Sequence, residues 1–179
     1  MDLMKALKIN FLVLIAILFI SSCKGEAVTI VDAGKACTFS EVSGYLLKDG
    51  EPLGNSKITR VADWQGEVVD SVITDAEGYF QMPAIYERKT IGVLPSQFAA
   101  KQLLTVDVDG QTIKFWSGVK MDKSENSEAK GQKLVINCDL AREESVVSVD
   151  GQPFVTLCEW NVVPDTPVAA DDFFTTDDD

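Results

Sequence analysis

The sequence predicts an all-β protein, built as a Greek-key β-sandwich of about seven to nine strands. Three Asp-Gly pairs, Asp49-Gly50, Asp109-Gly110 and Asp150-Gly151, each separate two short apolar stretches. Asp-Gly between such stretches is a strong β-hairpin signal. The stretches themselves are rich in β-branched and aromatic residues, which strands favour. No segment of residues 37–163 shows a helical repeat of apolar residues.

The chain begins with a segment typical of export. Lys5 and Lys8 precede an uninterrupted apolar stretch at residues 11–20. This stretch is too short to span a bilayer as a helix, which needs about 20 residues. Its length fits the hydrophobic part of a secretory signal.

Ile20-Ser21-Ser22-Cys23 follows this stretch and resembles the lipobox of bacterial lipoproteins. The resemblance implies a signal peptide at residues 1–22, lipidation of Cys23 and a lipidated tether at residues 23–36. The alternative is an ordinary signal peptide with a chance cysteine. A bacterial lipoprotein usually carries more than one acyl chain, which is enough for stable anchoring.

The residue after Cys23 is Lys24 rather than aspartate, so the common inner-membrane retention signal of Gram-negative bacteria is missing. We therefore expect a lipid-anchored protein of the cell envelope. In a Gram-negative source it would sit in the outer membrane, facing the periplasm or the surface.

The body of the protein is expected at residues 37–163, as one β-sandwich domain. Its second turn, Asp75 to Gly78, has a local physical rationale. The Asp75 side chain can accept hydrogen bonds from backbone N–H groups ahead of it, and Gly78 can take a positive φ. The aromatic side chain that follows, at Tyr79-Phe80, then points into the core.

The same region resembles the carboxypeptidase regulatory-like domain. The resemblance rests on Gly44, on Asp49-Gly50-Glu51-Pro52-Leu53-Gly54 and on Thr74 to Phe80, and covers roughly residues 42–85. It implies a transthyretin-like sandwich, similar in class to immunoglobulin-like sandwiches. The later part, residues 94–160, looks like an extension found in uncharacterised proteobacterial proteins that carry this domain. Members of the broader family are accessory modules, so the resemblance implies no catalysis.

Cysteine usage predicts one structural disulfide. Pairing is expected in the oxidising compartment of an exported chain, and Cys37, Cys138 and Cys158 remain once Cys23 is lipidated. We predict a Cys138–Cys158 bond, because both residues stand late on predicted strands that a hairpin separates. Pairings with Cys37 stay open.

Composition argues against several classes of function. The formal net charge of -12 repels nucleic acid phosphates. The chain contains no histidine, so the commonest general base and the commonest zinc ligand are missing. We therefore expect no enzyme, no cofactor, no metal site and no nucleic-acid partner. Calcium at the paired carboxylates of hairpin ends, such as Asp107 and Asp109, remains an alternative.

The expected function is that of a non-catalytic module that binds another protein. Trp64, Tyr86 and Arg88 are the candidate binding surface, while core packing is expected for most other aromatic residues. One version is an immunity protein against a periplasmic toxin, since an acidic surface suits a basic partner. The alternative is a carbohydrate-binding module of the envelope, with exposed tryptophans stacking on sugars.

Two polar segments complete the chain. Residues 122–133 are polar and charged, and we expect a solvated loop there. Residues 164–179 are acidic and predict a disordered tail.

Overall fold

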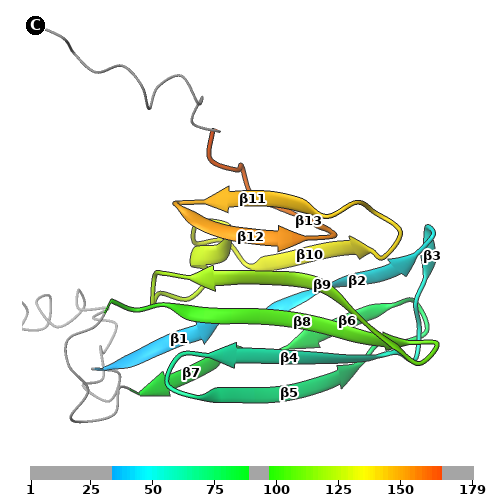
Figure 1. Ribbon diagram of the computed structural model, residues 1–179, viewed down its shortest axis with the longest axis horizontal. Helices are drawn as coiled ribbons and strands as arrows, with labels where there is room; N and C mark the ends of the chain where they lie inside the picture. The colour runs from blue at the N-terminus through cyan, green and yellow to red at the C-terminus, as the bar shows by residue number, and fades with distance from the viewer. Residues whose placement is uncertain (1–33, 89–96, 167–179) are drawn as a thin grey trace, which may run out of the picture. The chain divides into compact units, whose positions relative to one another are not determined.

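A computed structural model describes residues 34–88 and 97–166 as thirteen β-strands and a short 3-10 helix (Figure 1). The predicted signal peptide, Cys23 and residues 167–179 of the predicted acidic tail lie outside the described residues. Residues 164–166 of that tail are described, and Asp165 is held by hydrogen bonds rather than disordered. The elements are β1 (Lys35–Phe39), β2 (Val42–Lys48), β3 (Glu51–Pro52), β4 (Lys57–Asp63), β5 (Glu67–Ile73), β6 (Tyr79–Met82), β7 (Ile85–Arg88), β8 (Ala100–Val108), β9 (Gln111–Lys120), η2 (Ser127–Ala129), β10 (Leu134–Asp139), β11 (Ser145–Val149), β12 (Gln152–Thr156) and β13 (Cys158–Trp160).

The strands form a sandwich, which confirms the predicted all-β class. One sheet has six strands in the order β11-β12-β9-β8-β4-β5. The other has the order β13-β10-β2-β3, with β6 also paired to β2, and β1 pairs separately with β7. The β2–β10 pair is parallel, and it brings together segments that are about 90 residues apart in the chain. No helix within the described ranges has the length and hydrophobicity that crossing a membrane requires.

The strand count exceeds seven to nine because β1, β3 and β7 are additional to the expected strands and the strand expected at residues 154–160 is divided. Pro83, which has no N–H to donate to a ladder, separates β6 from β7. At the other end of the sequence Leu157 separates β12 from β13, and the chain passes there from the six-stranded sheet to the five-stranded one. The Leu157 N–H donates to the Phe115 carbonyl across 3.0 Å at this crossing.

All three predicted Asp-Gly hairpins are present. In each turn both residues have positive φ, from 49° to 56° for the aspartates and from 75° to 80° for the glycines, as a two-residue type I′ turn requires. Two of the turns are held by a distant carboxylate. Asp139 accepts the N–H groups of Asp49 and Gly50 at 3.0 and 2.8 Å. Asp165 accepts those of the Asp150-Gly151 turn at 3.0 and 2.8 Å.

The predicted turn after β5 is also confirmed. Asp75 Oδ1 accepts the N–H groups of Glu77 and Tyr79 at 3.1 and 2.7 Å. Gly78 has a φ of 77°. Phe80 then points into the core, where it is 1% exposed.

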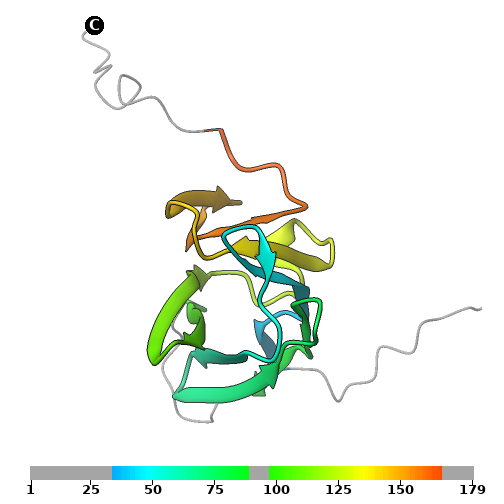
Figure 2. The same ribbon diagram turned by 90° about the vertical axis from the view of Figure 1, so that its right-hand side faces the viewer.

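The core fills the space between the two large sheets (Figure 2). Inward positions alternate with outward ones along the strands, as the pleat demands. Two of the three tryptophans pack here, with Trp116 4.8 Å from Trp160 and 5.0 Å from Phe154 between ring centroids. The largest fully buried apolar side chains are Trp116, Phe39, Phe80, Phe115, Phe154, Leu46, Ile58, Met82, Leu104 and Leu134.

Candidate functional site

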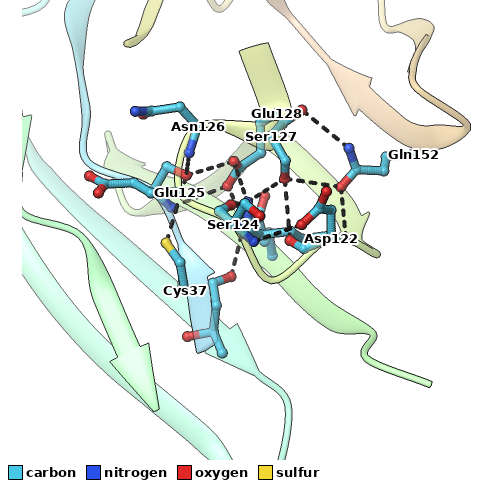
Figure 3. A network of polar contacts seen from close by, with 12 residues as sticks. Cys37, Asp122, Ser124, Glu125, Asn126, Ser127, Glu128 and Gln152 are labelled. Atoms are coloured by element: carbon cyan, nitrogen blue, oxygen red, sulfur yellow. Dashed lines mark hydrogen bonds and ion pairs between the residues drawn. The ribbon is translucent and has the colours of Figure 1, made fainter. Parts of the chain in front are cut away.

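A buried polar cluster lies where the connection from β9 to β10 folds back onto the sheets. We define it as Ser40, Gln102, Lys120, Ser127, Glu128 and Gln152, all of them buried. Figure 3 shows Gln152 turned toward Ser127, where Gln152 Nε2 donates to the Ser127 carbonyl at 3.2 Å. Buried ionised groups are tolerated only when they are paired and hydrogen-bonded, so the partners of each member decide what the cluster can do.

Lys120, at the end of β9, has all three ammonium protons satisfied. Its Nζ donates to the Ser124 carbonyl at 2.8 Å, to Ser127 Oγ at 2.5 Å and to Glu128 Oε2 at 2.6 Å. Neither Lys120 nor Glu128 exposes any side-chain surface. The ammonium group therefore has no proton free for a ligand.

The Glu128 carboxylate accepts four hydrogen bonds. Besides Lys120, the donors are the Ser40 N–H at 3.1 Å, the Ser40 hydroxyl at 2.6 Å and Gln102 Nε2 at 2.8 Å. Burial by itself raises the pKa of Glu128. The Lys120 charge and the hydrogen bonds from Lys120, Ser40 and Gln102 outweigh burial, so the net pKa is lowered and the carboxylate is ionised.

The turn that carries Glu128 is short and made by two left-handed residues. Asn126 and Lys130, which flank η2, have φ of 63° and 50°. The Asn126 carbonyl accepts the N–H groups of Ala129 and Gly131 at 3.0 and 2.8 Å, which closes the turn. Trp160 Nε1 donates to the Glu128 carbonyl at 3.0 Å and fastens the turn to β13.

The expectation of a fully solvated loop at residues 122–133 is therefore wrong at its centre. Ser127, Glu128 and Ala129 are buried, while residues on either side of them are exposed. The physical reason is the charge pairing. The polar groups that suggested solvation reach partners inside the protein instead of water.

Cys37 lies beside the cluster but is not set up for chemistry. Its Sγ is 3.8 Å from Ser40 Oγ and the residue is buried. Burial raises the pKa of the thiol to about 11, against a smaller opposing effect of Lys120. A thiol with such a pKa stays protonated at neutral pH and is a poor nucleophile.

The predicted disulfide is confirmed. Cys138 on β10 and Cys158 on β13 are direct cross-strand partners and are bonded to each other. Cys37 is the free cysteine among the described residues. The bond attaches β13, a strand of three residues, to the parallel pair at the centre of its sheet.

The structure places the candidate surface residues on two elements: Tyr86 and Arg88 stand two residues apart on β7, and Trp64 directly follows β4. Trp64 is half-buried and packs edge-on against Phe98, with ring centroids 5.2 Å apart. Arg88 stands close to this turn, because Gln65 Nε2 donates to its carbonyl at 3.1 Å. Tyr86 is 41% exposed, and its hydroxyl donates to Glu125 Oε2 at 2.6 Å.

The carboxylates considered for calcium have other partners. Asp107 accepts the Thr112 hydroxyl at 2.7 Å, and Asp109 pairs with Lys48 at 3.0 Å. Asp75 holds its own turn, as described above. Within residues 34–88 and 97–166, no three or more cysteine, aspartate or glutamate side chains group as metal ligands would.

The outward face of the six-stranded sheet carries a feature that spans every strand. Cross-strand partners continue from one edge of the sheet to the other, and all but one are apolar. This apolar row consists of Val69, Val61, Leu103, Ser117, Val155 and Val146. Val69 and Val146, on the edge strands, are 56% and 76% exposed, and the members between them are partly exposed.

A groove of about 520 Å³ follows the central part of this row, lined by Val61, Leu103, Ser117 and Val155 among others. The face differs from the buried cluster in being open to a partner. Contiguous exposed apolar surface with a polar rim is typical of protein interaction sites.

Comparison with known proteins identifies a family for this chain. No curated protein sequence and no solved structure matches the chain. One family model matches residues 42–143, which is more than half of the chain and includes β2 to β10 with Lys120 and Glu128. The chain therefore belongs to the family described as a domain of unknown function, DUF6795.

Proposed function

We propose that this protein is a lipid-anchored, non-catalytic envelope lipoprotein that serves as an accessory module and binds another protein. The observation that carries the binding role is the apolar row with its groove on the six-stranded sheet. Isolated exposed apolar residues are normal, but a row that crosses six strands is not expected without a partner.

The anchoring part of the proposal rests on Cys23 and the segment before it. Ten apolar residues after two lysines, followed by Ile20-Ser21-Ser22-Cys23, give the order of a lipoprotein signal. The Cys138–Cys158 disulfide supports an exported location, since such bonds persist in oxidising compartments. An outer-membrane or periplasmic setting agrees with both.

The non-catalytic part rests on the state of the buried polar cluster. Every proton of the Lys120 ammonium group and both oxygens of the Glu128 carboxylate are engaged within the protein. A general acid or base must instead reach a substrate proton. The cluster is better explained as the structural anchor of the β9–β10 connection. An immunity role against a basic toxin is one form that the binding function could take.

Capture from cross-linked envelopes tests the binding role. We expect the tagged parent to retain a stoichiometric protein partner, and Val61→Glu to lose it, because a charge is placed in the groove of the apolar row. Val135→Glu is the matched control, since Val135 is a partly exposed valine on β10 of the other sheet. Equal capture by the parent and Val61→Glu would refute a role for this face.

Cys23→Ser tests the anchor separately. The parent is expected to take up labelled fatty acid and to fractionate with membranes, and the variant to do neither. A variant that still carries lipid would show that Cys23 is not the attachment point.

A further inference from the structure

The pattern of charges around the apolar row is the starting point. On β4 and β8, which are neighbours in the six-stranded sheet, four outward residues form the corners of a rectangle. Asp63 and Lys101 are cross-strand partners at one end. Lys57 and Asp107 stand at the other end, next to the partners Ile58 and Val106. Negative and positive charges thus alternate around the rectangle.

The interior of the rectangle is uncharged. The outward residues between the corners are Thr59 and Val61 on β4 and Thr105 and Leu103 on β8, paired as Thr59 with Thr105 and Val61 with Leu103. All four are partly exposed. The result is a patch with an apolar and threonine-lined centre and four charges of alternating sign.

Such a pattern is complementary to itself. A two-fold axis that lies in the plane of contact, parallel to the strands and between β4 and β8, brings each position of β4 opposite its cross-strand partner on β8 of a second copy. Val61 then faces Leu103, and Asp63 faces Lys101. At the other end Lys57 faces Asp107. A two-fold interface requires this kind of self-complementarity, and like charges never meet.

We propose that the partner of this face is a second copy of the same chain, which packs its six-stranded sheet against the first. The inference rests on the proposed binding function of this face and on the lipid anchor. Sheets that pack face to face keep their strands within about 30° of each other, which the strand-parallel axis allows. Each contact between charged corners occurs twice, so four intermolecular ion pairs surround two apolar contacts.

The size of the patch sets the expected strength. With the axis between β4 and β8, the strands that overlap the second copy are β5, β4, β8 and β9. At about 4.8 Å between strands and a rise of about 3.4 Å per residue, these strands present roughly 400–500 Å² per copy. A total of roughly 800–1,000 Å² is at the weak end of specific interfaces. Two copies that share one membrane gain in effective concentration. The pair is therefore expected in the envelope and expected to be weak in dilute solution.

Charge reversal gives a test that does not depend on disrupting the fold. The full chain is expressed in its envelope with two different tags, and capture through one tag after cross-linking reports the other. We expect the parent to capture itself. Asp63→Lys and Lys101→Asp, each expressed with both tags, should lose at least ten-fold in self-capture, because like charges then face each other twice.

Mixing the two variants should restore capture. When one tag marks Asp63→Lys and the other marks Lys101→Asp, both facing pairs again have opposite charge. Restoration also shows that both variants are folded. The control Val135→Glu should capture itself as the parent does.

The results separate this inference from the proposed function. A parent that does not capture itself, or single reversals that capture themselves undiminished, would overturn the second copy as the partner. If self-capture is absent but Val61→Glu still loses another stoichiometric protein, the binding function stands with a different occupant. Self-capture by the parent, its loss in each single reversal and its recovery when the two variants are mixed would together confirm face-to-face packing of the two copies.

Discussion

Replacing Glu128 by glutamine is expected to destabilise the protein more than any exposed substitution of the same size. The glutamine carbonyl can still accept from the Ser40 N–H and from Gln102. Its NH₂ group, however, takes the place of the oxygen that accepted from Lys120 and from the Ser40 hydroxyl. Donors then face donors, and a fully buried ammonium group loses its counter-ion.

The magnitude follows from these contacts. Removing one partner of a buried ion pair costs about 3–5 kcal/mol. We therefore expect Glu128→Gln to lower the free energy of unfolding by about 3–5 kcal/mol.

Urea unfolding at pH 7 measures the loss, from the midpoint at constant m-value. Lys48→Met, in the exposed Lys48–Asp109 pair, is the control and should cost less than about 1 kcal/mol. The double variant Lys120→Met/Glu128→Gln should cost clearly less than the sum of its single variants, because it leaves no unpaired charge. A Glu128→Gln loss no larger than that of the control would refute the buried pair.

The pH dependence of the free energy of unfolding at low pH tests the same Glu128 carboxylate a second time. The folded-state pKa of Glu128 lies below its ordinary value of 4.5, because Lys120 and the hydrogen bonds outweigh burial. A lowered pKa contributes stability above the ordinary value, and that contribution is lost as the pH falls through the folded-state pKa. The stability difference between the parent and Glu128→Gln should therefore shrink below about pH 4.5.

Three further outcomes are expected. Replacing both Cys138 and Cys158 by alanine should lower the urea unfolding free energy by about 3 kcal/mol, as loop-closure entropy predicts for a bridge between residues 20 apart; an unchanged midpoint would contradict this. Cys37 should resist iodoacetamide at pH 8 in the folded protein and react promptly in urea, which mass spectrometry detects; fast labelling of the folded chain would contradict its burial and its pKa of about 11. Gly44→Ala should lower stability by about 3 kcal/mol or more, since its Cβ would lie 1.6 Å from the Ile136 carbonyl oxygen; normal stability by circular dichroism would show that β2 and β10 can separate.

Local sequence signals predicted the features that are local in the structure. An Asp-Gly pair between apolar stretches requires only its own backbone to turn, so all three hairpins were predictable. The turn from Asp75 to Gly78 depends on contacts within five residues and was predictable for the same reason. The Cys138–Cys158 pair was also predicted, although Cys158 begins β13 rather than standing late on a longer strand.

The buried polar cluster was missed, although a signal for it exists. Gln102 stands between Ala100 and Leu104, so the two-residue period of a strand places it on the inward face. Arg60 is similarly placed between Ile58 and Ala62, where it is fully buried and binds Asp70 with two hydrogen bonds. A polar residue at a position where the strand alternation points side chains into the core predicts a buried polar group. Its partner cannot be predicted, because that depends on contacts between segments far apart in the chain.

The apolar row was beyond prediction for another reason. Val61 and Leu103 are partners only because β4 pairs with β8, which lies about 40 residues further along the chain. Ser117 and Val155 meet through the β9–β12 pair in the same way. The register of nonconsecutive strands is set by the tertiary fold, whereas Trp64, Tyr86 and Arg88 were chosen from local composition alone.

The crossing at Leu157 has a consequence for how the protein opens. Because β12 belongs to one sheet and β13 to the other, one residue links the two layers covalently, and the Cys138–Cys158 bond links β13 in turn to the parallel pair. Neither sheet can therefore separate from the sandwich without straining the other sheet. Native-state hydrogen exchange should therefore show the amides of β10 and β12 exchanging through a single opening event, with the sandwich behaving as one cooperative unit.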